Sequence, residues 1–403
     1  MISWTFACAA VLLALAAAFL PERVRTPAIL LLSLAGVAAV WDVPIAALVA
    51  IALAVWGAGV ALPRLPERVR SAALLASVAA IVAALVWLRS GHPARASLVP
   101  TSALVGVSYF SLKFIQHLVD AAAGRTPAIG PVPFLATIFF LPTYSAGPIE
   151  RTAEFPRKLA DGAMPWGERV LGVERILLGL AKKLLVGDPL LAYAEPVFRE
   201  PWLADRGTLW LAMYAFALAV YLDFAGYSDI AIGTSRLAGI RVRENFDSPY
   251  LQPNLTMLWQ RWHMSLTSWL RDFVFVPVAR RALRATRRPL ASQAAAQTAT
   301  MVLCGLWHGV AWNFAAWGLY HAVLLTGLGV WRGRRAGRVA PAAPVTAAAP
   351  PAGGRGVVRL RDAASIAATF HSFALGLVLF GCPLGIALRY LARMFFADGL
   401  LPR

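Results

Sequence analysis

Apolar runs long enough to cross a lipid bilayer recur along the whole chain. A membrane-spanning helix needs about 20 consecutive, mostly apolar residues. Charged residues make up only 14% of the chain and hydrophobic residues 59%, a balance typical of multi-span membrane proteins and unlike that of a soluble domain. The pattern predicts an all-α, polytopic membrane protein with about ten to twelve membrane segments, some of them re-entrant or interfacial. The candidate segments are 2–20, 27–41, 43–62, 71–89, 98–118, 131–146, 168–186, 207–227, 297–308, 311–331, 363–381 and 383–396.

The formal net charge of +18 comes from Lys and Arg residues that lie mostly between the apolar runs. This placement follows the positive-inside rule for cytoplasmic loops, so the charge does not indicate nucleic-acid binding. Residues 2–20 have no basic region before them and are followed by further apolar segments, which favours a first membrane helix over a secretory signal. Arg23 and Arg25 come next, which predicts an outside N-terminus and a cytoplasmic loop.

The hexapeptide LPERVR occurs at 20–25 and again at 65–70, and each copy precedes an apolar run that contains Val-Trp, at 40–41 and 86–87. The segments 27–41 and 43–62 lie between the copies and would return the chain to the same side of the membrane. Both basic loops can therefore be cytoplasmic. Duplication of a helical hairpin and chance in an Ala-, Leu- and Arg-rich chain explain the repeat equally well.

Three segments between the apolar runs have a composition of their own. Residues 150–183 are first polar and then amphipathic, and RILLGLAKKLL at 175–185 predicts an interfacial helix. Residues 280–288, RRALRATRR, carry five Arg and no acidic residue. Residues 332–361 carry seven Arg among Ala, Pro and Gly, which indicates a flexible, low-complexity cytoplasmic loop.

The Cys and His residues do not have the spacing of a metal site. Cys8, Cys304 and Cys382 all lie in apolar segments, where we expect them to act as small buried hydrophobic residues. The six His residues are scattered along the chain. We therefore expect neither a metal nor another resident cofactor.

His308 is an imidazole inside the largely apolar stretch LCGLWHGVAWN at 303–313. An ionisable residue within a membrane segment is a candidate functional residue, although a His that only hydrogen-bonds inside a helix bundle is the plainer interpretation. Gly305 and Gly309 would let another helix or a substrate approach closely, and Gly309 also favours a break in the helix. For His92, His321 and His371 we favour a purely structural role.

Polar residues are dense in the stretch from 221 to 275. Such residues beside membrane helices are costly unless they line a cavity or pair with one another. Trp259, Trp262 and Trp269 recur at helical spacings of three and seven, so the simplest interpretation is one juxtamembrane helix with an aromatic belt and cytoplasmic Arg residues. A second interpretation is catalytic: a neutral imidazole can take the proton of a hydroxyl that attacks a thioester, and Arg can hold a phosphate-bearing donor.

Six motifs together resemble the membrane-bound O-acyltransferase family. LWQRWHMSLTSWLRDFVFVPV at 258–278, DFAGYSDIAIG at 223–233, ENFDSPYL at 244–251 and LWHGVAWNFAAWGLYH at 306–321 are similar to motifs of the family. FFLPTYSAGPIERTAEF at 139–155 and KKLLVGDPL at 182–190 resemble its bacterial branch, which includes alginate O-acetyltransferases and teichoic-acid D-alanyltransferases. The motifs cover roughly residues 100–330 in the family's order.

The resemblance implies a ring of tilted membrane helices around a funnel or tunnel in which a cytoplasmic donor meets an acceptor from the other face. His308 matches the family's catalytically required His, which would be the general base, and His263 matches a second His of the bacterial branch. It also implies a catalytic core at 98–331, preceded by membrane hairpins at 1–97 and followed by the basic loop at 332–362 and C-terminal helices at 363–403. The candidate donor-binding or tunnel-lining residues are Arg261, Trp262, Arg271, Asp272, Tyr227, Ser228, Asp229, Asn245, Trp307 and Asn313.

The activity implied is transfer of an acyl group, foremost acetyl from acetyl-CoA as a co-substrate, to hydroxyls of an envelope or exported polysaccharide. A separate extracytoplasmic protein would complete the modification, and the location would be a bacterial inner membrane. The Arg-rich 280–288 replaces an expected Gly-containing turn, so acceptor and partner stay open. The alternatives are D-alanyl transfer from a carrier protein to teichoic acid, acylation of a lipid or small molecule, and a proton-coupled transporter or flippase. The transporter is disfavoured because the LPERVR repeat omits the polar core.

Overall fold

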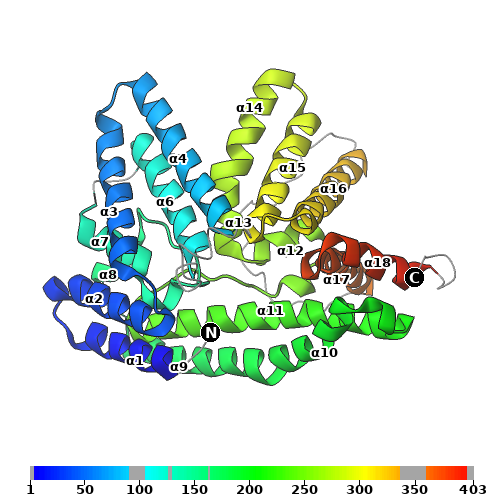
Figure 1. Ribbon diagram of the computed structural model, residues 1–403, viewed down its shortest axis with the longest axis horizontal. Helices are drawn as coiled ribbons and strands as arrows, with labels where there is room; N and C mark the ends of the chain where they lie inside the picture. Colours follow the sequence, from blue (N-terminus) through cyan, green and yellow to red (C-terminus); the bar gives the residue numbers. More distant parts are fainter. Residues whose placement is uncertain (1–3, 90–104, 126–128, 162–163, 336–359, 397–403) are drawn as a thin grey trace. The chain divides into compact units, whose positions relative to one another are not determined.

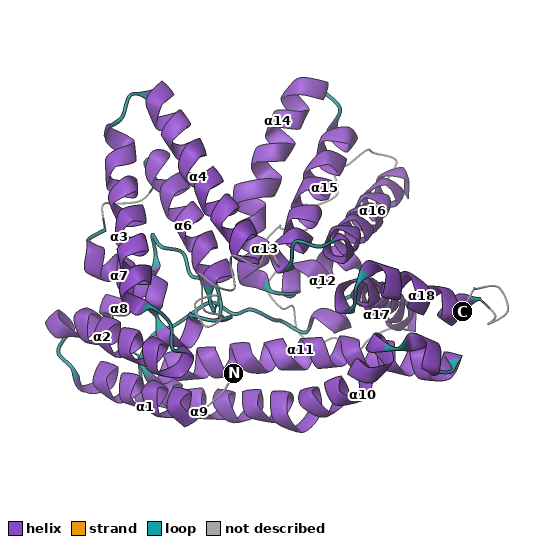
Figure 2. Ribbon diagram, viewed as in Figure 1, coloured by secondary structure: helices purple, strands orange, loops and turns teal. Residues whose placement is uncertain are grey.

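A computed structural model describes residues 4–89, 105–125, 129–161, 164–335 and 360–396 (Figure 1). Within these residues every regular element is a helix and none is a strand (Figure 2). Six of the described helices are long and apolar enough to span a membrane: Arg23–Trp41, Ile45–Arg64, Glu67–Arg89, Arg206–Leu237, Trp312–Arg332 and Asp362–Gly381. The predicted all-α, polytopic membrane class is therefore confirmed. Each of the other apolar segments predicted from the sequence also contains a helix.

The chain forms two compact units that are not continuous in sequence. The first unit comprises Met1–Leu180 and Gly226–Arg243, and the second comprises Ala181–Ala225 and Glu244–Arg403. Helix α11 (Arg206–Leu237) is shared, because its first part belongs to the second unit and its last part to the first. This division follows packing. The four-part division by function expected from the sequence stays a prediction, and its basic loop lies largely outside the described residues.

The first unit begins with consecutive apolar helices. Its elements are α1 (Trp4–Phe19), α2 (Glu22–Trp41), α3 (Ile45–Ala61), α4 (Glu67–Arg89), α6 (Val107–Ala122), α7 (Pro131–Phe139), α8 (Phe155–Asp161), α9 (Trp166–Leu180) and the end of α11. The two LPERVR copies stand at the starts of α2 and α4, where each Pro directly precedes the first helical residue, a position that costs no hydrogen bond. Two candidate spans separate the copies, which agrees with placing both on one side of the membrane.

The predicted segment 131–146 is interrupted and is not one helix. Helix α7 ends at Phe139, and a 3₁₀ turn follows at Leu141–Thr143. Pro142 lies in this turn and cannot continue an α-helix. Neighbouring side chains satisfy backbone groups around the break: the Leu141 N–H donates to Ser33 Oγ at 3.2 Å, and Lys113 Nζ donates to the Thr137 carbonyl at 3.0 Å.

The second unit carries the polar motifs. Its elements are α10 (Asp188–Arg199), the start of α11, α12 (Leu255–Arg261), α13 (Met264–Leu270), α14 (Val276–Thr286), α15 (Pro289–His308), α16 (Trp312–Arg335), α17 (Leu360–Gly381) and α18 (Leu384–Phe395). Short π-helical segments precede α10 and α14, at Ala181–Gly187 and Arg271–Phe275. The Arg residues of 280–288 are all exposed, on α14 and on the turn after it.

Helices α15 and α16 form a close antiparallel pair (Figure 1). A Cβ added at Gly305 would lie 2.1 Å from the Phe314 carbonyl oxygen, and one added at Gly318 would lie 2.3 Å from the Met301 carbonyl oxygen. Gly309 faces the Phe314 ring, at 2.3 Å from an added Cβ. The prediction that glycines beside His308 allow another helix to approach closely is therefore confirmed.

The single juxtamembrane helix expected around the three Trp residues is wrong. Helix α12 ends at Arg261 and α13 begins at Met264, so the spacing from Trp259 to Trp262 does not define one helical face. His263 lies at the break in a left-handed conformation, with φ 43° and ψ 54°. His adopts the left-handed conformation more often than most residues do. The break can therefore form without a Gly or Pro, and the sequence gives no sign of it.

Candidate functional site

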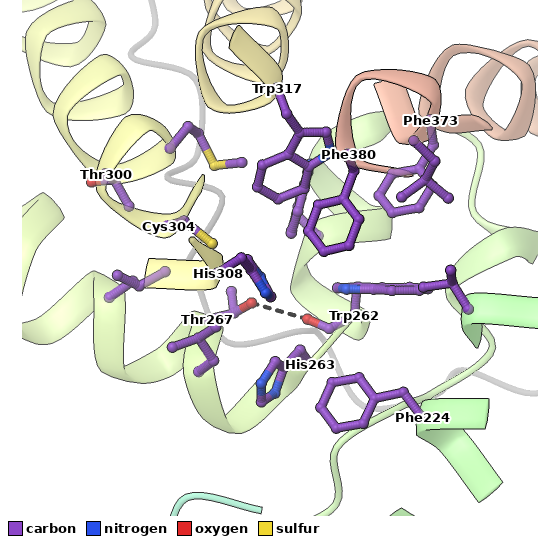
Figure 3. A pocket seen from close by; sticks show the side chains of 16 residues that line it. Phe224, Trp262, His263, Thr267, Thr300, Cys304, His308, Trp317, Phe373 and Phe380 are labelled. Atoms are coloured by element: carbon purple, nitrogen blue, oxygen red, sulfur yellow. Dashed lines mark hydrogen bonds between the residues drawn. The ribbon is translucent and has the colours of Figure 1, made fainter. Parts of the chain in front are cut away.

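A cavity of about 120 Å³ lies inside the second unit (Figure 3). Helices α11, α13, α15, α16 and α17 contribute its walls, together with the end of α12 and the break before α13. The lining residues are Val220, Phe224, Trp259, Trp262, His263, Leu266, Thr267, Leu270, Thr300, Met301, Cys304, His308, Trp317, Phe373, Leu377 and Phe380. His308 and His263, which are 45 positions apart in sequence, therefore face the same small space.

His308 is the last residue of α15, and Gly309 leaves the helix in an extended conformation. Aromatic rings surround the imidazole: the centroid of Trp307 lies 4.8 Å away, that of Phe380 5.0 Å and that of Trp317 5.8 Å. Figure 3 shows the Trp317 and Phe380 rings on one side of the imidazole. The end of a helix thus projects one basic group into an aromatic enclosure.

His263 is 2% exposed, and the backbone turn before α13 directs its ring. Its Nδ1 lies 2.9 Å from Asn245 Oδ1, and the Phe224 ring stands edge-on at 4.7 Å. This residue lies outside the six candidate spans. Burial, and then the neighbouring His308, lower the pKa of His263 well below its ordinary value. The imidazole is therefore neutral at pH 7.

The rest of the lining is apolar or already hydrogen-bonded. Thr267 Oγ1 donates to the Trp262 carbonyl at 2.9 Å, the bond drawn in Figure 3, and Thr300 Oγ1 donates to the Ala296 carbonyl at 2.7 Å. Among the described residues, none that lines the cavity has a carboxylate, Lys or Arg side chain. The two imidazoles are thus the strongest hydrogen-bonding groups that face the cavity.

The other residues predicted for the site divide into four groups. Trp262 lines the cavity, and the Trp307 ring packs 6.3 Å from that of His263. Arg261 pairs with Asp247 at 2.7 Å, and Arg271 pairs with Asp272 at 2.7 Å, and none of these four lines the cavity. Asn245 and Asn313 are buried at 0% and 8% exposure and do not line it either.

Tyr227, Ser228 and Asp229 lie on the part of α11 that belongs to the first unit. There, Tyr227 Oη and Ser145 Oγ share a hydrogen bond of 2.5 Å, and Arg175 Nε donates to Asp229 Oδ1 at 2.6 Å. The GYSD motif thus joins α9 and the residues before α8 in a buried polar network of the first unit.

Sequence reasoning did not identify the three Phe residues that line the cavity among the described residues. Phe373 and Phe380 are on α17, in a plain apolar run that gives no signal of its own. Phe224 stands inside the DFAGYSD motif, which drew attention only to its polar members. His321 is fully buried among Trp259, Trp317 and Phe373 and does not line the cavity, in agreement with a structural role.

In the part of the chain that the structure describes, no three His, Cys, Asp or Glu residues are grouped so that they could hold a metal ion. The described residues that line the cavity also include no cluster of cations for a phosphate. The arrangement offers two imidazoles in an aromatic enclosure, which suits proton transfer between a hydroxyl and a leaving group.

The polytopic, helical architecture agrees with the family that similarity to known proteins shows. The family model described as MBOAT, membrane-bound O-acyltransferase family, matches residues 69–349. The chain belongs to the membrane-bound O-acyltransferase family, and the resemblance predicted from its motifs is confirmed.

Individual relatives are named for different acylation reactions. The chain is 34% identical over 226 residues to a probable alginate O-acetylase of Azotobacter vinelandii, covering 55% of this chain and 43% of that protein. It is 31% identical over 268 residues to a teichoic acid D-alanyltransferase of Bacillus subtilis, covering 63% and 66%. It is 28% identical over 194 residues to a peptidoglycan O-acetyltransferase of Helicobacter pylori, covering 47% and 36%. The match thus spans less than half of the alginate relative.

Proposed function

We propose that this chain is an O-acyltransferase that moves an acetyl group from acetyl-CoA to hydroxyls of an envelope or exported polysaccharide, or to an extracytoplasmic partner that completes the modification. The observation that carries the proposal is the convergence of His308 and His263, from separate elements, on one aromatic cavity. Membership of the acyltransferase family supports it.

The reaction needs a proton to move twice. An acceptor hydroxyl oxygen attacks the thioester carbonyl carbon while His308 takes the hydroxyl proton. The tetrahedral intermediate then collapses, the carbon–sulfur bond breaks, and the proton on His308 passes to the leaving sulfur. The products are an ester and a free thiol, and the imidazole returns to its neutral state. An aromatic enclosure excludes water, which would otherwise compete with the hydroxyl for the thioester.

The size and polarity of the cavity favour a small, uncharged acyl group. An apolar cavity of about 150 Å³ holds one benzene molecule, so a space of about 120 Å³ suits a group of a few heavy atoms. A D-alanyl group would bring an ammonium into a cavity whose described lining residues include no carboxylate, and an unpaired buried charge is costly. Two of the relatives are named as O-acetylating proteins, which points the same way.

The names of the relatives support a class of acceptor and a location. Alginate, peptidoglycan and teichoic acid are all polymers of the bacterial envelope or exterior. With six candidate spans in the described residues, the chain fits a multi-pass protein of the inner membrane, where a cytoplasmic thioester and an extracytoplasmic polymer can both reach it.

Membrane vesicles that contain the full chain test the proposal with radiolabelled acetyl-CoA and total envelope polysaccharide. Wild type should transfer label, and His308→Ala should lower the rate by about a thousandfold or more, because general base catalysis and alignment are lost together. His371→Gln is the matched control: it removes an imidazole of the same unit that bonds Tyr214 Oη and does not line the cavity. Equal rates for wild type and His308→Ala would refute the role of His308.

Two other outcomes would redirect the assignment. Transfer only from a D-alanyl carrier protein would replace acetyl-CoA as the donor. Movement of solute across the membrane with no ester formed by any donor would instead identify a transporter.

A further inference from the structure

Asn245 forms several hydrogen bonds with the turn around His263. Its Oδ1 lies 2.9 Å from His263 Nδ1, 2.8 Å from Ser265 Oγ and 3.3 Å from the Ser265 backbone nitrogen. Its backbone carbonyl accepts the Met264 N–H at 2.8 Å. One buried residue therefore binds three consecutive residues, beginning with the left-handed His263.

These contacts decide which atom of the Asn245 amide faces the turn. Oxygen and nitrogen of an amide side chain are told apart only by their hydrogen-bond partners. The Ser265 backbone N–H can only donate, so the amide atom opposite it must be the oxygen. If the oxygen and nitrogen of the Asn245 amide were exchanged, its NH₂ group would face the Ser265 backbone N–H, and two donors would oppose each other.

The same contacts decide the protonation of His263. An amide oxygen only accepts hydrogen bonds, so His263 Nδ1 must carry the hydrogen in its bond to Asn245. In a neutral imidazole the other nitrogen, Nε2, then has a free lone pair and no hydrogen. Asn245 does not line the cavity, whereas the His263 ring does, so Nε2 is the nitrogen left for a substrate.

We infer that Asn245 is a positioning residue that holds His263 as the Nδ1–H tautomer, so that Nε2 accepts a hydrogen bond from a substrate O–H or N–H group. His263 then belongs to the hydroxyl side of the reaction. It cannot donate a hydrogen bond from Nε2 to the oxyanion of a tetrahedral intermediate. The part of the inference that concerns the substrate rests on the proposed acyl transfer, and the part that concerns the tautomer does not.

The surroundings of His263 make its protonation sensitive to residue 245. The rings packed against it, Phe224 and Trp307, are uncharged, and the titratable group that acts on it is His308. A carboxylate in place of the Asn245 amide would keep the acceptor oxygen. It would also add a negative charge beside Nδ1–H, which favours the imidazolium and raises the pKa of His263 by about one unit or more.

Nitrogen-15 NMR of the full chain, labelled at histidine, reads the tautomer directly, and His263→Gln identifies the signals. Wild type at pH 7.5 should show a protonated Nδ1 and an unprotonated Nε2 for this ring. Asn245→Ala should give a mixture of tautomers, whereas Ser265→Ala, which removes one hydroxyl and leaves the amide in place, should keep the wild-type signals. A protonated Nε2 in wild type would overturn the inference.

The pH profile of acetyl transfer tests the same residue through the reaction. Neutral His263 is the active form, so the fall in wild-type transfer that comes from protonation of His263 should lie at a pH well below the ordinary His value of about 6.5. Asn245→Asp should move this fall to higher pH by about one unit. Asn245→Ala should lower the rate at pH 7.5 by about tenfold to a hundredfold, the usual cost of losing a group that orients a functional His.

A residue with only a structural role would not move the profile, since Asn245→Asp keeps the bonds to Ser265. An unchanged profile for this variant would therefore also overturn the inference. If wild type transfers no acyl group from any donor while the NMR signals are as expected, the proposed function fails and the tautomer assignment stands.

Discussion

At the scale of single residues, we expect Met301 to limit the length of the acyl group. Its side chain is 2% exposed and forms part of the cavity wall on α15, two turns before His308. A buried Met that is cut back to Ala leaves space that a ligand can fill. The cavity would then extend away from the two imidazoles without changing them.

Met301→Ala should accept butyryl-CoA and hexanoyl-CoA better than wild type, with about a tenfold gain in their rates relative to acetyl-CoA, or about 1.4 kcal/mol of added transition-state binding. The measurement is a competition between donors of different length. Met257→Ala is the control, because Met257 lies on α12 and does not line the cavity. The same donor preference in Met301→Ala and wild type would show that another wall sets the length.

The two His residues were accessible to sequence reasoning because their motifs resemble those of the family. Their convergence on one cavity could not be predicted, because it depends on a turn at His263 that contains neither Gly nor Pro. For Arg261, Arg271 and Asp272, the resemblance to the family predicted donor binding or tunnel lining. The structure instead pairs them with neighbouring charges, and sequence cannot choose between pairing and ligand binding.

At the scale of elements, the approach of α15 to α16 determines where His308 lies. Gly305 is one turn before His308, and its missing side chain lets the Phe314 carbonyl approach. A methyl group there must push the two helices apart, because backbone atoms cannot move aside as a flexible side chain can.

Gly305→Ala should lower the free energy of unfolding by about 1–3 kcal/mol and lower acyl transfer through displacement of His308. Thermal unfolding in detergent, followed by intrinsic Trp fluorescence, measures the change. Gly327→Ala on the same helix pair is the control: an added Cβ meets nothing within 4 Å, and Ala favours a helix over Gly by about 1 kcal/mol. Equal unfolding temperatures for the two variants would contradict the close-packing argument.

Apolar runs predicted the helices because a bilayer leaves few other ways to satisfy a backbone. Interruptions were harder to predict. Pro142 is a sequence signal for the break within 131–146. The break between α12 and α13 has no such local signal, because it is stabilised by hydrogen bonds from Asn245, which lies outside both helices.

At the scale of the whole molecule, the three spans from 23 to 89 fix the sidedness of the LPERVR copies. Arg23 and Arg68 are exposed and should face the cytoplasm, and Pro44, between the first two spans, should face outward. Arg23→Cys, Arg68→Cys and Pro44→Cys can be made in a Cys8→Ala background, because Cys304 and Cys382 are buried.

A membrane-impermeant maleimide should label the Pro44→Cys protein in intact spheroplasts and the other two only after permeabilisation. Opposite labelling of the Arg23 and Arg68 variants would show that one of the intervening helices does not cross the membrane.

The discontinuous first unit has a consequence for biogenesis. Residues 181–225 belong to the second unit but are synthesised before Gly226–Arg243, the segment that completes the first. At about 5–20 residues per second, the ribosome needs seconds to synthesise residues 181–225. During this time the end of α11 is absent, and the surface of the first unit that packs against it stays uncovered. A fragment that stops at Leu180 should therefore expose the surface that this segment covers and be a target for quality-control proteases, whereas one that extends past Arg243 contains every residue of the first unit.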